Sequence, residues 1–295
     1  MMNRSWPAVS GLAIALIAIS VPAQEAPAVV KRQKVVVIGA SVSAGFEDPT
    51  SKQADGSVNR SFKLDLVFKK VWPRKVARVY NAANLLMFQD PVGGGQRQVD
   101  LAKKVEADLV VAVDFPFWFG YGFPSFDSVV KKGEISKPRM AVQQECFKML
   151  DELKCPILIG DYPDMRGAST KMLPRHMIPN AATIAALNEK LHAYAGKRKN
   201  VHIVSLAKFV KRAVTVPQTY SYGDGEVVFP KNYLLQADRL HATRLGVVVI
   251  TTHALSALPK MLKKDSPLLD HGATLKTLVK SMRLEDEIPQ DKTGR

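Results

Sequence analysis

A serine in a turn of small residues is the first group in this chain whose setting could support covalent chemistry. Ser41 lies in residues 39–45 (GASVSAG), directly after the apolar run 35–38. Small residues let the backbone turn sharply, and a helix that begins at the turn offers free N–H groups to a developing anion. A hydroxyl placed there could act as a nucleophile beside an oxyanion hole. An ordinary N-cap serine has the same local sequence, whereas the GxGxxG and GK[ST] patterns of phosphate loops are missing from it.

A carboxylate and an imidazole far downstream could supply the acid–base half of the same chemistry. Asp238 and His241 are three residues apart, just before a predicted helix over 243–256. A carboxylate at this spacing can reach the imidazole of its own turn, fix the tautomer and stabilise the imidazolium formed when the ring takes a serine proton. A solvent-facing Asp and His would show the same D-x-x-H spacing. The Asp238–His241 spacing indicates catalysis only in combination with Ser41.

Both blocks resemble the SGNH/GDSL hydrolase family. Residues 39–45 are similar to the family's GDS(L) nucleophile block, and residues 238–246 (DRLHATRLG) to its closing D-x-x-H-P-t-x-x-G block, with Ala242 where proline is usual. The resemblance covers roughly residues 33–262. It implies a serine acyl-enzyme that hydrolyses esters or transfers acyl groups, and no metal or organic cofactor. The catalytic residues that the resemblance implies are Ser41, Asp238 and His241.

The chain departs from the family at the oxyanion hole. The family takes donors from the serine N–H, a glycine after the second strand, and an asparagine after the third. Here residues 81–88 (NAANLLMF) contain no glycine and residues 114–122 (DFPFWFGYG) contain no asparagine. Asp114 or Phe117 stands at the asparagine position, and Asn84 could supply a replacement amide. The candidate oxyanion residues are therefore Ser41, Asn84 and Asp114.

Aromatic residues crowd the end of the third predicted strand. Phe117, Trp118 and Tyr121 lie there within residues 115–121, and we expect them to line a substrate pocket. Their role would be to hold an acyl chain or to stack on a sugar. A hydrophobic lid or an ordinary core contact would use the same residue types.

These residues must be positioned by alternating strands and helices. Short β-branched runs predict five strands, at 35–38, 76–80, 109–113, 156–159 and 201–204. Helical apolar spacing predicts helices at 62–72, 99–105, 139–153, 184–194 and 243–256. Such alternation predicts a three-layer α/β/α sandwich with a five-stranded parallel sheet, which is flavodoxin-like. Sites in this architecture lie at the carboxyl ends of the strands. A turn signal within 219–233 predicts a hairpin insertion.

The N-terminus has the layout of a secretory signal peptide. Arg4 precedes the apolar run 11–19, and Val21-Pro22-Ala23 is a small-residue cleavage pattern. We therefore expect a signal peptide over 1–23 with cleavage after Ala23, a linker over 24–32, and a periplasmic or secreted protein without a transmembrane span once the signal is removed. The hydrolase-like domain is expected over 33–262. A C-terminal extension follows over 263–295, with a flexible end.

The charge balance is strongly basic. The 295 residues include 42 Lys and Arg against 27 Asp and Glu, a formal charge of +15. Such a charge indicates either a soluble basic surface without a dedicated partner or a surface that attracts anionic lipid or acidic glycan. No zinc-finger, helix-turn-helix or RNP-like pattern occurs, so no specific nucleic acid is expected. The two cysteines, Cys146 and Cys155, fit neither a CxxC motif nor a zinc site; a disulfide and two unpaired thiols both remain open.

Together these patterns predict an exported SGNH-type serine hydrolase that cleaves carboxylic ester (O-acyl) bonds through an acyl-enzyme on Ser41. The expected substrate is a glycan ester or a small acyl ester. One alternative is a catalytically impaired protein of the same fold that binds glycan or lipid. Another is an O-acyltransferase that acts on a polysaccharide.

Overall fold

The computed structural model describes residues 31–47, 62–121 and 133–290. The predicted signal peptide over 1–23 lies outside the described residues, as do residues 24–30 of the expected linker and 291–295 of the expected flexible end. Within the described ranges, no helix combines the length and apolarity that a membrane span requires.

A five-stranded parallel sheet forms the centre of the fold, as the sequence predicted. Its order is β2-β1-β3-β4-β5, with neighbouring strands paired in parallel. The strands are β1 (Gln33–Val37), β2 (Ala77–Asn81), β3 (Leu109–Ala112), β4 (Ile157–Gly160) and β5 (Val201–Val204). Strands β3 and β4 are buried throughout, which explains why they are continuous apolar runs without alternation.

The strand order reverses between β1 and β3. The chain passes from β1 to β2 on one side and returns to place β3 on the other side of β1. In open α/β sheets, a crevice opens at such a switch point, outside the carboxyl ends of the strands. The turn after β1 carries Ser41 and the turn after β3 carries Asp114, so both residues lie at this crevice.

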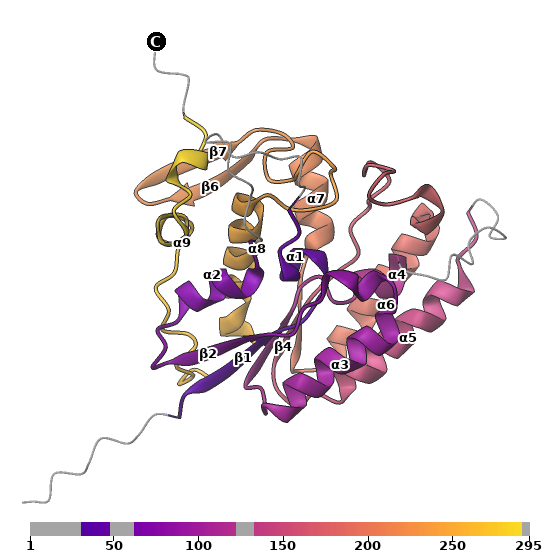
Figure 1. Cartoon of the computed structure of the whole chain (residues 1–295), viewed down its shortest axis with the longest axis horizontal. Coiled ribbons are helices and arrows are strands. Elements are labelled where there is room, and N and C mark those ends of the chain that lie inside the picture. The colour runs from indigo at the N-terminus through magenta and orange to yellow at the C-terminus, as the bar shows by residue number, and fades with distance from the viewer. Residues whose placement is uncertain (1–30, 48–61, 122–132, 291–295) are drawn as a thin grey trace, which may run out of the picture. The chain divides into compact units, whose positions relative to one another are not determined.

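Helices cover both faces of the sheet, which completes the predicted three-layer sandwich (Figure 1). One layer contains α3 (Pro91–Lys104), α5 (Lys137–Asp151) and α6 (Ala181–Gly196). The other contains α2 (Leu64–Val71), α8 (Arg244–Ala257) and α9 (Leu275–Met282). Helix α7 (Leu206–Thr215) follows β5, and the remaining helical segments are short turns: α1 (Ser41–Ala44), η1 (Leu85–Phe88), α4 (Phe117–Tyr121), η3 (Arg175–Met177), η4 (Leu258–Lys260) and η5 (Glu285–Glu287).

The insertion and the C-terminal extension are both ordered parts of the described chain. Strands β6 (Gln218–Tyr222) and β7 (Gly225–Phe229) form an antiparallel hairpin, as the turn signal predicted. Helix α9 packs against α2 and α8. The final 3-10 turn is attached to the domain, because Arg244 forms an ion pair with Glu287 at 3.4 Å and the Tyr233 hydroxyl donates to the Glu287 carbonyl at 2.8 Å.

Helix α3 begins eight residues before the start that the sequence predicted, at Pro91 instead of 99. Asp90 caps it by accepting from the Gly93 N–H at 2.9 Å, and a proline at the first helical position costs no hydrogen bond. Glycine is required further along, since a Cβ on Gly95 would lie 2.8 Å from the Phe119 ring. The glycines that suggest a loop in the sequence thus permit close packing inside the helix.

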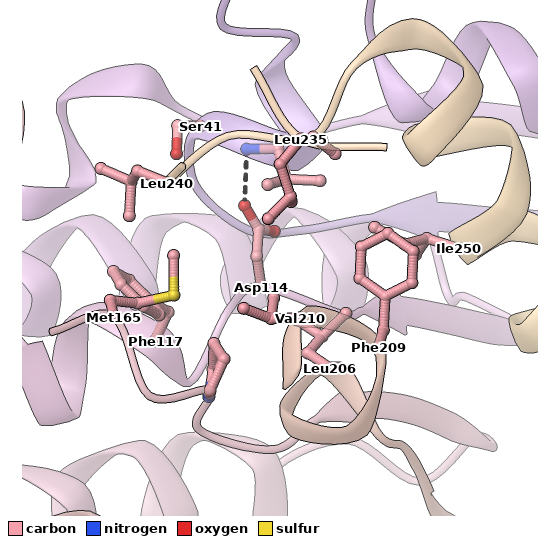
Figure 2. Close-up of a pocket in the computed structure, with 13 residues that line it drawn as sticks. Ser41, Asp114, Phe117, Met165, Leu206, Phe209, Val210, Leu235, Leu240 and Ile250 are labelled. Carbon is pink, nitrogen blue, oxygen red and sulfur yellow. Dashed lines mark hydrogen bonds between the residues drawn. The ribbon is translucent and has the colours of Figure 1, made fainter. Parts of the chain in front are cut away.

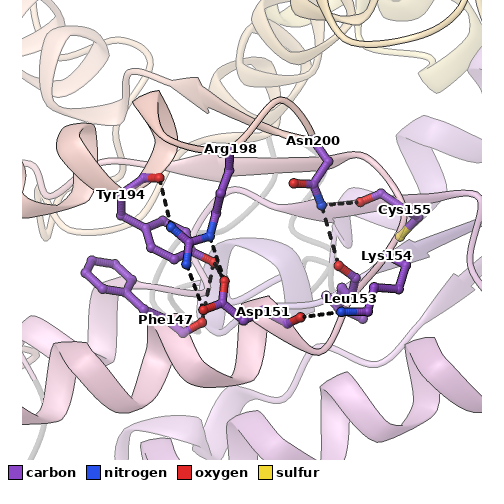
Figure 3. A network of polar contacts seen from close by, with 8 residues as sticks. All are labelled: Phe147, Asp151, Leu153, Lys154, Cys155, Tyr194, Arg198 and Asn200. Carbon is purple, nitrogen blue, oxygen red and sulfur yellow. Dashed lines mark hydrogen bonds and ion pairs between the residues drawn. The ribbon is translucent and has the colours of Figure 1, made fainter.

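A polar network ties together the amino ends of β4 and β5, at the end of the sheet remote from the crevice (Figure 3). The Arg198 guanidinium donates to both carboxylate oxygens of Asp151, at 2.7 and 2.8 Å. It also lies 3.8 Å from the centre of the Tyr194 ring. Asn200 donates to the Cys155 carbonyl at 3.1 Å. Such bidentate contacts fix the relative position of α5 and α6.

Both cysteines are free thiols. Cys146 is buried within α5, and burial raises the pKa of its thiol well above the ordinary value. Burial also raises the pKa of Cys155 to about 11. Because the thiolate is the reactive form, both thiols are chemically quiet at neutral pH.

Candidate active site

The turn that carries Ser41 is fixed by a glycine that no other residue could replace. Gly39 has φ +148°, and a Cβ built on it would lie 2.0 Å from the Asp114 carboxylate. Its N–H donates to Gln98 Oε1 at 2.6 Å, and Gln98 Nε2 donates back to its carbonyl at 3.0 Å. Gln98 comes from α3 and is buried. The turn that carries Ser41 is therefore held to α3 by both backbone polar groups of Gly39.

Asp238 and His241 form the hydrogen-bonded pair that their spacing predicted. His241 Nδ1 and Asp238 Oδ2 are 2.7 Å apart. The other carboxylate oxygen accepts from the backbone N–H groups of Leu240 at 2.9 Å and His241 at 3.0 Å. Both side chains are buried. A carboxylate can only accept, so Nδ1 is the ring nitrogen that donates in this contact and Nε2 is the one left to accept a proton.

The Asp238 carboxylate is kept ionised by this setting. Burial by itself would raise the pKa of Asp238, but the hydrogen bonds from the His241 ring and from two backbone N–H groups outweigh it and lower the pKa below the usual value of 3.8. An ionised carboxylate at this distance stabilises the imidazolium that forms when the ring accepts a proton. The geometry of the pair is therefore that of a general base held by a carboxylate.

Ser41 and the Asp238–His241 segment meet at one pocket. Its lining includes Ser41 from the turn after β1, and Leu240 and Ala242 on either side of His241. Within the described part of the chain, the Ser41 hydroxyl has no hydrogen-bond partner, so the Ser41–His241 hydrogen bond of a working triad is not formed in this structure. Catalytic hydrogen bonds in ligand-free sites are often long and tighten only with substrate.

The pocket is narrow and apolar (Figure 2). Its walls are built from aliphatic and aromatic side chains of several elements, including Phe117, Met165, Leu206, Phe209, Val210, Leu235 and Ile250. The space open to the centre of a water molecule is about 40 Å³, which corresponds to roughly three or four water molecules. A short acyl group fits such a space, whereas a long chain would extend beyond it.

Asp114 lies at the floor of the crevice as a hydrogen-bond acceptor. Its Oδ2 accepts from the Val42 N–H at 2.9 Å (Figure 2). Oδ2 also accepts from the Ser43 N–H at 3.2 Å, and Oδ1 accepts from the Ser43 hydroxyl at 2.5 Å. Burial raises the pKa of Asp114, although the Ser43 and Val42 hydrogen bonds partly oppose the shift. The expectation that Asp114 serves as an oxyanion group is corrected by these contacts, because the side chain caps α1 and donates nothing to the pocket.

The backbone donors after β2 are already occupied. The N–H groups of Ala82, Ala83 and Asn84 donate to Val37 O, Asn81 Oδ1 and Gly39 O, at 2.8, 2.8 and 3.0 Å. No acceptor for the Ser41 N–H is found among the described residues. The Asn84 side chain is exposed, and its oxygen accepts from the Leu86 N–H at 2.9 Å. Its amide N–H₂ is therefore a second candidate donor to an oxyanion, after the Ser41 N–H.

Only one of the three aromatic residues expected at the pocket lines it. Phe117 does so. Tyr121 is instead buried beneath it, stacked on the Phe117 ring at 4.3 Å, and its hydroxyl donates to the Pro163 carbonyl at 2.5 Å. Trp118 packs in the core against Phe88. The expectation is corrected for these two residues: helix α4 turns one ring toward the crevice and the others inward.

Two residues that support the site were missed in the sequence. Gln98 forms two hydrogen bonds with Gly39, as described above. Gln236 connects the segment after α1 to the segment that carries His241, because its amide donates to Phe46 O at 2.9 Å and to Ala242 O at 2.8 Å. Phe46 in turn stacks on the His241 ring, with centroids 4.1 Å apart. A signal for Gln98 existed, since it is a polar residue next to the apolar positions of a predicted helix. Gln236 has no such signal.

Comparison of the sequence with family models and with curated proteins finds no match. Solved structures that are similar to this chain include the crystal structure of TesA (17% identity, 78% of this chain and 100% of that chain covered, TM-score 0.44). A putative GDSL-like lipase from Parabacteroides merdae is 10% identical over 78% of this chain and 97% of its own, with a TM-score of 0.45. An acetylxylan esterase from Geobacillus stearothermophilus is 13% identical over 78% and 94%, with a TM-score of 0.39.

Likeness at these identities carries no information about substrate, and the fold assignment stands on this chain's own strand order and layers. The serine follows β1, the Asp–His pair precedes α8, and Ser41 lines the same pocket as Leu240 and Ala242 on either side of His241. The chain thus has a three-layer α/β/α fold around a five-stranded parallel sheet.

Proposed function

We propose that this protein is a serine esterase that cleaves short O-acyl groups from small molecules or glycans. The Ser41 hydroxyl attacks the ester carbonyl carbon while His241 Nε2 takes its proton. The Ser41 N–H and the Asn84 amide stabilise the resulting oxyanion. His241 then returns the proton to the departing alcohol, and a water molecule hydrolyses the acyl-enzyme by the same route in reverse.

One observation carries the proposal: a buried Asp238–His241 hydrogen bond of 2.7 Å is flanked by Leu240 and Ala242, and these two residues line the same apolar pocket as Ser41. A buried His–carboxylate pair can have a purely structural role. Here, however, the residues on both sides of the imidazole face the pocket that holds the serine. The sequence separation of Ser41 and His241 makes this meeting a property of the fold and not of local turn geometry.

The proposal is tested by labelling and by turnover of two esters. A fluorophosphonate probe should label Ser41, because labelling requires an activated serine. Because the pocket is small, kcat/KM for 4-nitrophenyl acetate should exceed that for 4-nitrophenyl octanoate by about tenfold or more. A preference for octanoate would contradict the short acyl group. Failure of labelling together with no turnover of either ester would contradict ester hydrolysis.

Replacement of Asn84 tests the second oxyanion donor. If its amide donates to the oxyanion, Asn84→Ala should lower kcat by about 10²-fold with little change in KM, since the contact is made only in the transition state. Asn180→Ala is a matched control, because Asn180 also caps a helix with its side chain but stands at the start of α6 and not beside Gly39. An unchanged kcat in Asn84→Ala would remove this residue from the mechanism.

A second candidate function is favoured by the state of the oxyanion site. The N–H groups after β2 already donate to internal acceptors, and neither Asp114 nor Phe117, the two candidates for the family's asparagine position, carries an amide. These two features fit a protein that retains the fold and binds an acyl glycan or lipid without turning it over. Binding of an acyl ester without its cleavage would identify this alternative. Appearance of an acylated saccharide acceptor in the same assay would instead identify acyl transfer.

We also propose that the protein is exported to the periplasm or the medium. The support is the signal-peptide pattern over residues 1–23.

A further inference from the structure

A second hollow lies on the outer edge of the sheet, separate from the catalytic pocket. It has a volume of about 390 Å³ and is bounded by the edge strand β5, helices α7 and α8, and strand β6. Lys208 and Arg212 enter from successive turns of α7, and Lys260 enters from η4. His202 of β5 and His253 of α8 complete a lining with five basic side chains.

The positive charge of this basic groove is not compensated. Its lining contains no Asp or Glu. Within residues 31–47, 62–121 and 133–290, none of Lys208, Arg212 and Lys260 forms an ion pair, whereas Lys69, Lys103 and Arg198 are each paired with a carboxylate. Because like charges in a concave site reinforce one another, the groove focuses a positive potential.

The pKa values of His202 and His253 are affected by the positive charge of the groove. Desolvation together with the nearby Lys208 and Arg212 lowers the pKa of His253. Desolvation together with Lys260 lowers the pKa of His202. Each imidazole therefore faces at least one cation of the groove lining, and an anion bound in the groove would relieve this repulsion.

We propose that the basic groove binds an acidic sugar unit of a glycan chain. Fixed cations supply charge-assisted hydrogen bonds to a carboxylate, sulfate or phosphate group on the sugar. The remaining polar lining suits the sugar ring, because Tyr220 offers an aromatic face and Thr219 and Ser256 offer hydroxyls. A lipid surface fits less well, since none of the large apolar side chains that are exposed elsewhere lines the groove.

The groove and the catalytic pocket share one side chain. Phe209 lines both, while Leu206 and Val210 of α7 face the pocket and Lys208 and Arg212 face the groove. Helix α7 is thus a common wall between them. The proposal does not depend on ester cleavage, because it concerns binding alone and its test contains no turnover step.

Binding of a defined acidic oligosaccharide by the full chain tests the proposal. Tetragalacturonate, titrated by calorimetry at low salt, should bind the wild-type protein, and the uncharged maltotetraose should not. In the Lys208→Gln/Arg212→Gln/Lys260→Gln variant, Kd for tetragalacturonate should rise by about tenfold or more, as expected from the loss of at least one charge-assisted hydrogen bond. Because all three side chains are exposed, the variant should keep its Tm. If it does not, the single Lys260→Gln variant replaces it.

A matched variant separates the groove from the overall charge. Lys104→Gln/Lys171→Gln/Lys190→Gln removes the same charge from exposed positions outside the groove, and it should change Kd by less than about threefold. Equal weakening in both triple variants would overturn the proposal in favour of net charge. It would also be overturned if the groove variant lost binding to phosphatidylglycerol vesicles while tetragalacturonate never bound.

Discussion

Replacement of Ser41 by alanine should reduce kcat for 4-nitrophenyl acetate by about 10⁴-fold or more, because no covalent acyl-enzyme can form without the hydroxyl. The fold should be unaffected, since the Ser41 hydroxyl makes no hydrogen bond within the described part of the chain. Steady-state kinetics and fluorophosphonate labelling measure the loss, and an unchanged Tm excludes unfolding as its cause.

Ser43 provides the matched control, two residues further along the same turn. Its hydroxyl donates to Asp114 at 2.5 Å and is fully buried. Ser43→Ala should therefore lower Tm, because it leaves a buried carboxylate oxygen without a partner, while Ser41 still becomes labelled. Should Ser43→Ala abolish labelling and Ser41→Ala preserve it, the nucleophile has been assigned to the wrong serine.

Asp238→Asn should lower kcat by about 10⁴-fold with little effect on KM. The amide can still accept from the Leu240 and His241 N–H groups through its oxygen, so the turn keeps its shape. Its N–H₂ group then faces His241 Nδ1 and forces the proton onto Nε2, which removes the base from the side that must meet the serine. Kinetics of the purified variant at neutral pH measure the effect.

Asp164→Asn is the control for Asp238→Asn. Asp164 is a surface carboxylate that pairs with Arg166 at 2.5 Å, and its loss should leave kcat within about twofold because surface ion pairs contribute little. A similar small effect of Asp238→Asn would show that His241 does not need its carboxylate partner. In that case the acid–base assignment would fail even if Ser41 were essential.

The sheet and the Asp–His pair were predictable because each depends on local sequence. Strands such as Val201–Val204 are short β-branched runs between polar residues, and these runs are read directly from the chain. The 2.7 Å contact between Asp238 and His241 needs only a three-residue spacing. The rule that crossovers between parallel strands are right-handed then limits the topologies open to such a chain.

Features that depend on partners distant in sequence were not predictable. Asp114 can be seen to cap α1 only when the ends of β1 and β3 are placed side by side. The inward direction of Trp118 and Tyr121 likewise depends on how α4 leaves β3. Helix α7 is different: Leu206, Phe209, Val210 and Ala213 have helical spacing behind an N-cap at Ser205, so this helix was missed although the sequence carries its signal.

The double hydrogen bond between Gln98 and Gly39 determines where catalytic motion can occur. Since both polar groups of the glycine unit end on one buried side chain, the serine travels with α3 and the sheet as a single rigid body. His241 sits instead on a loop attached to the turn after α1 through Gln236 and the Phe46 ring. In the proposed mechanism, the movement that brings the Ser41 hydroxyl and the His241 imidazole together is therefore a movement of the loop that carries His241. The stiffness of this loop would then affect the turnover rate.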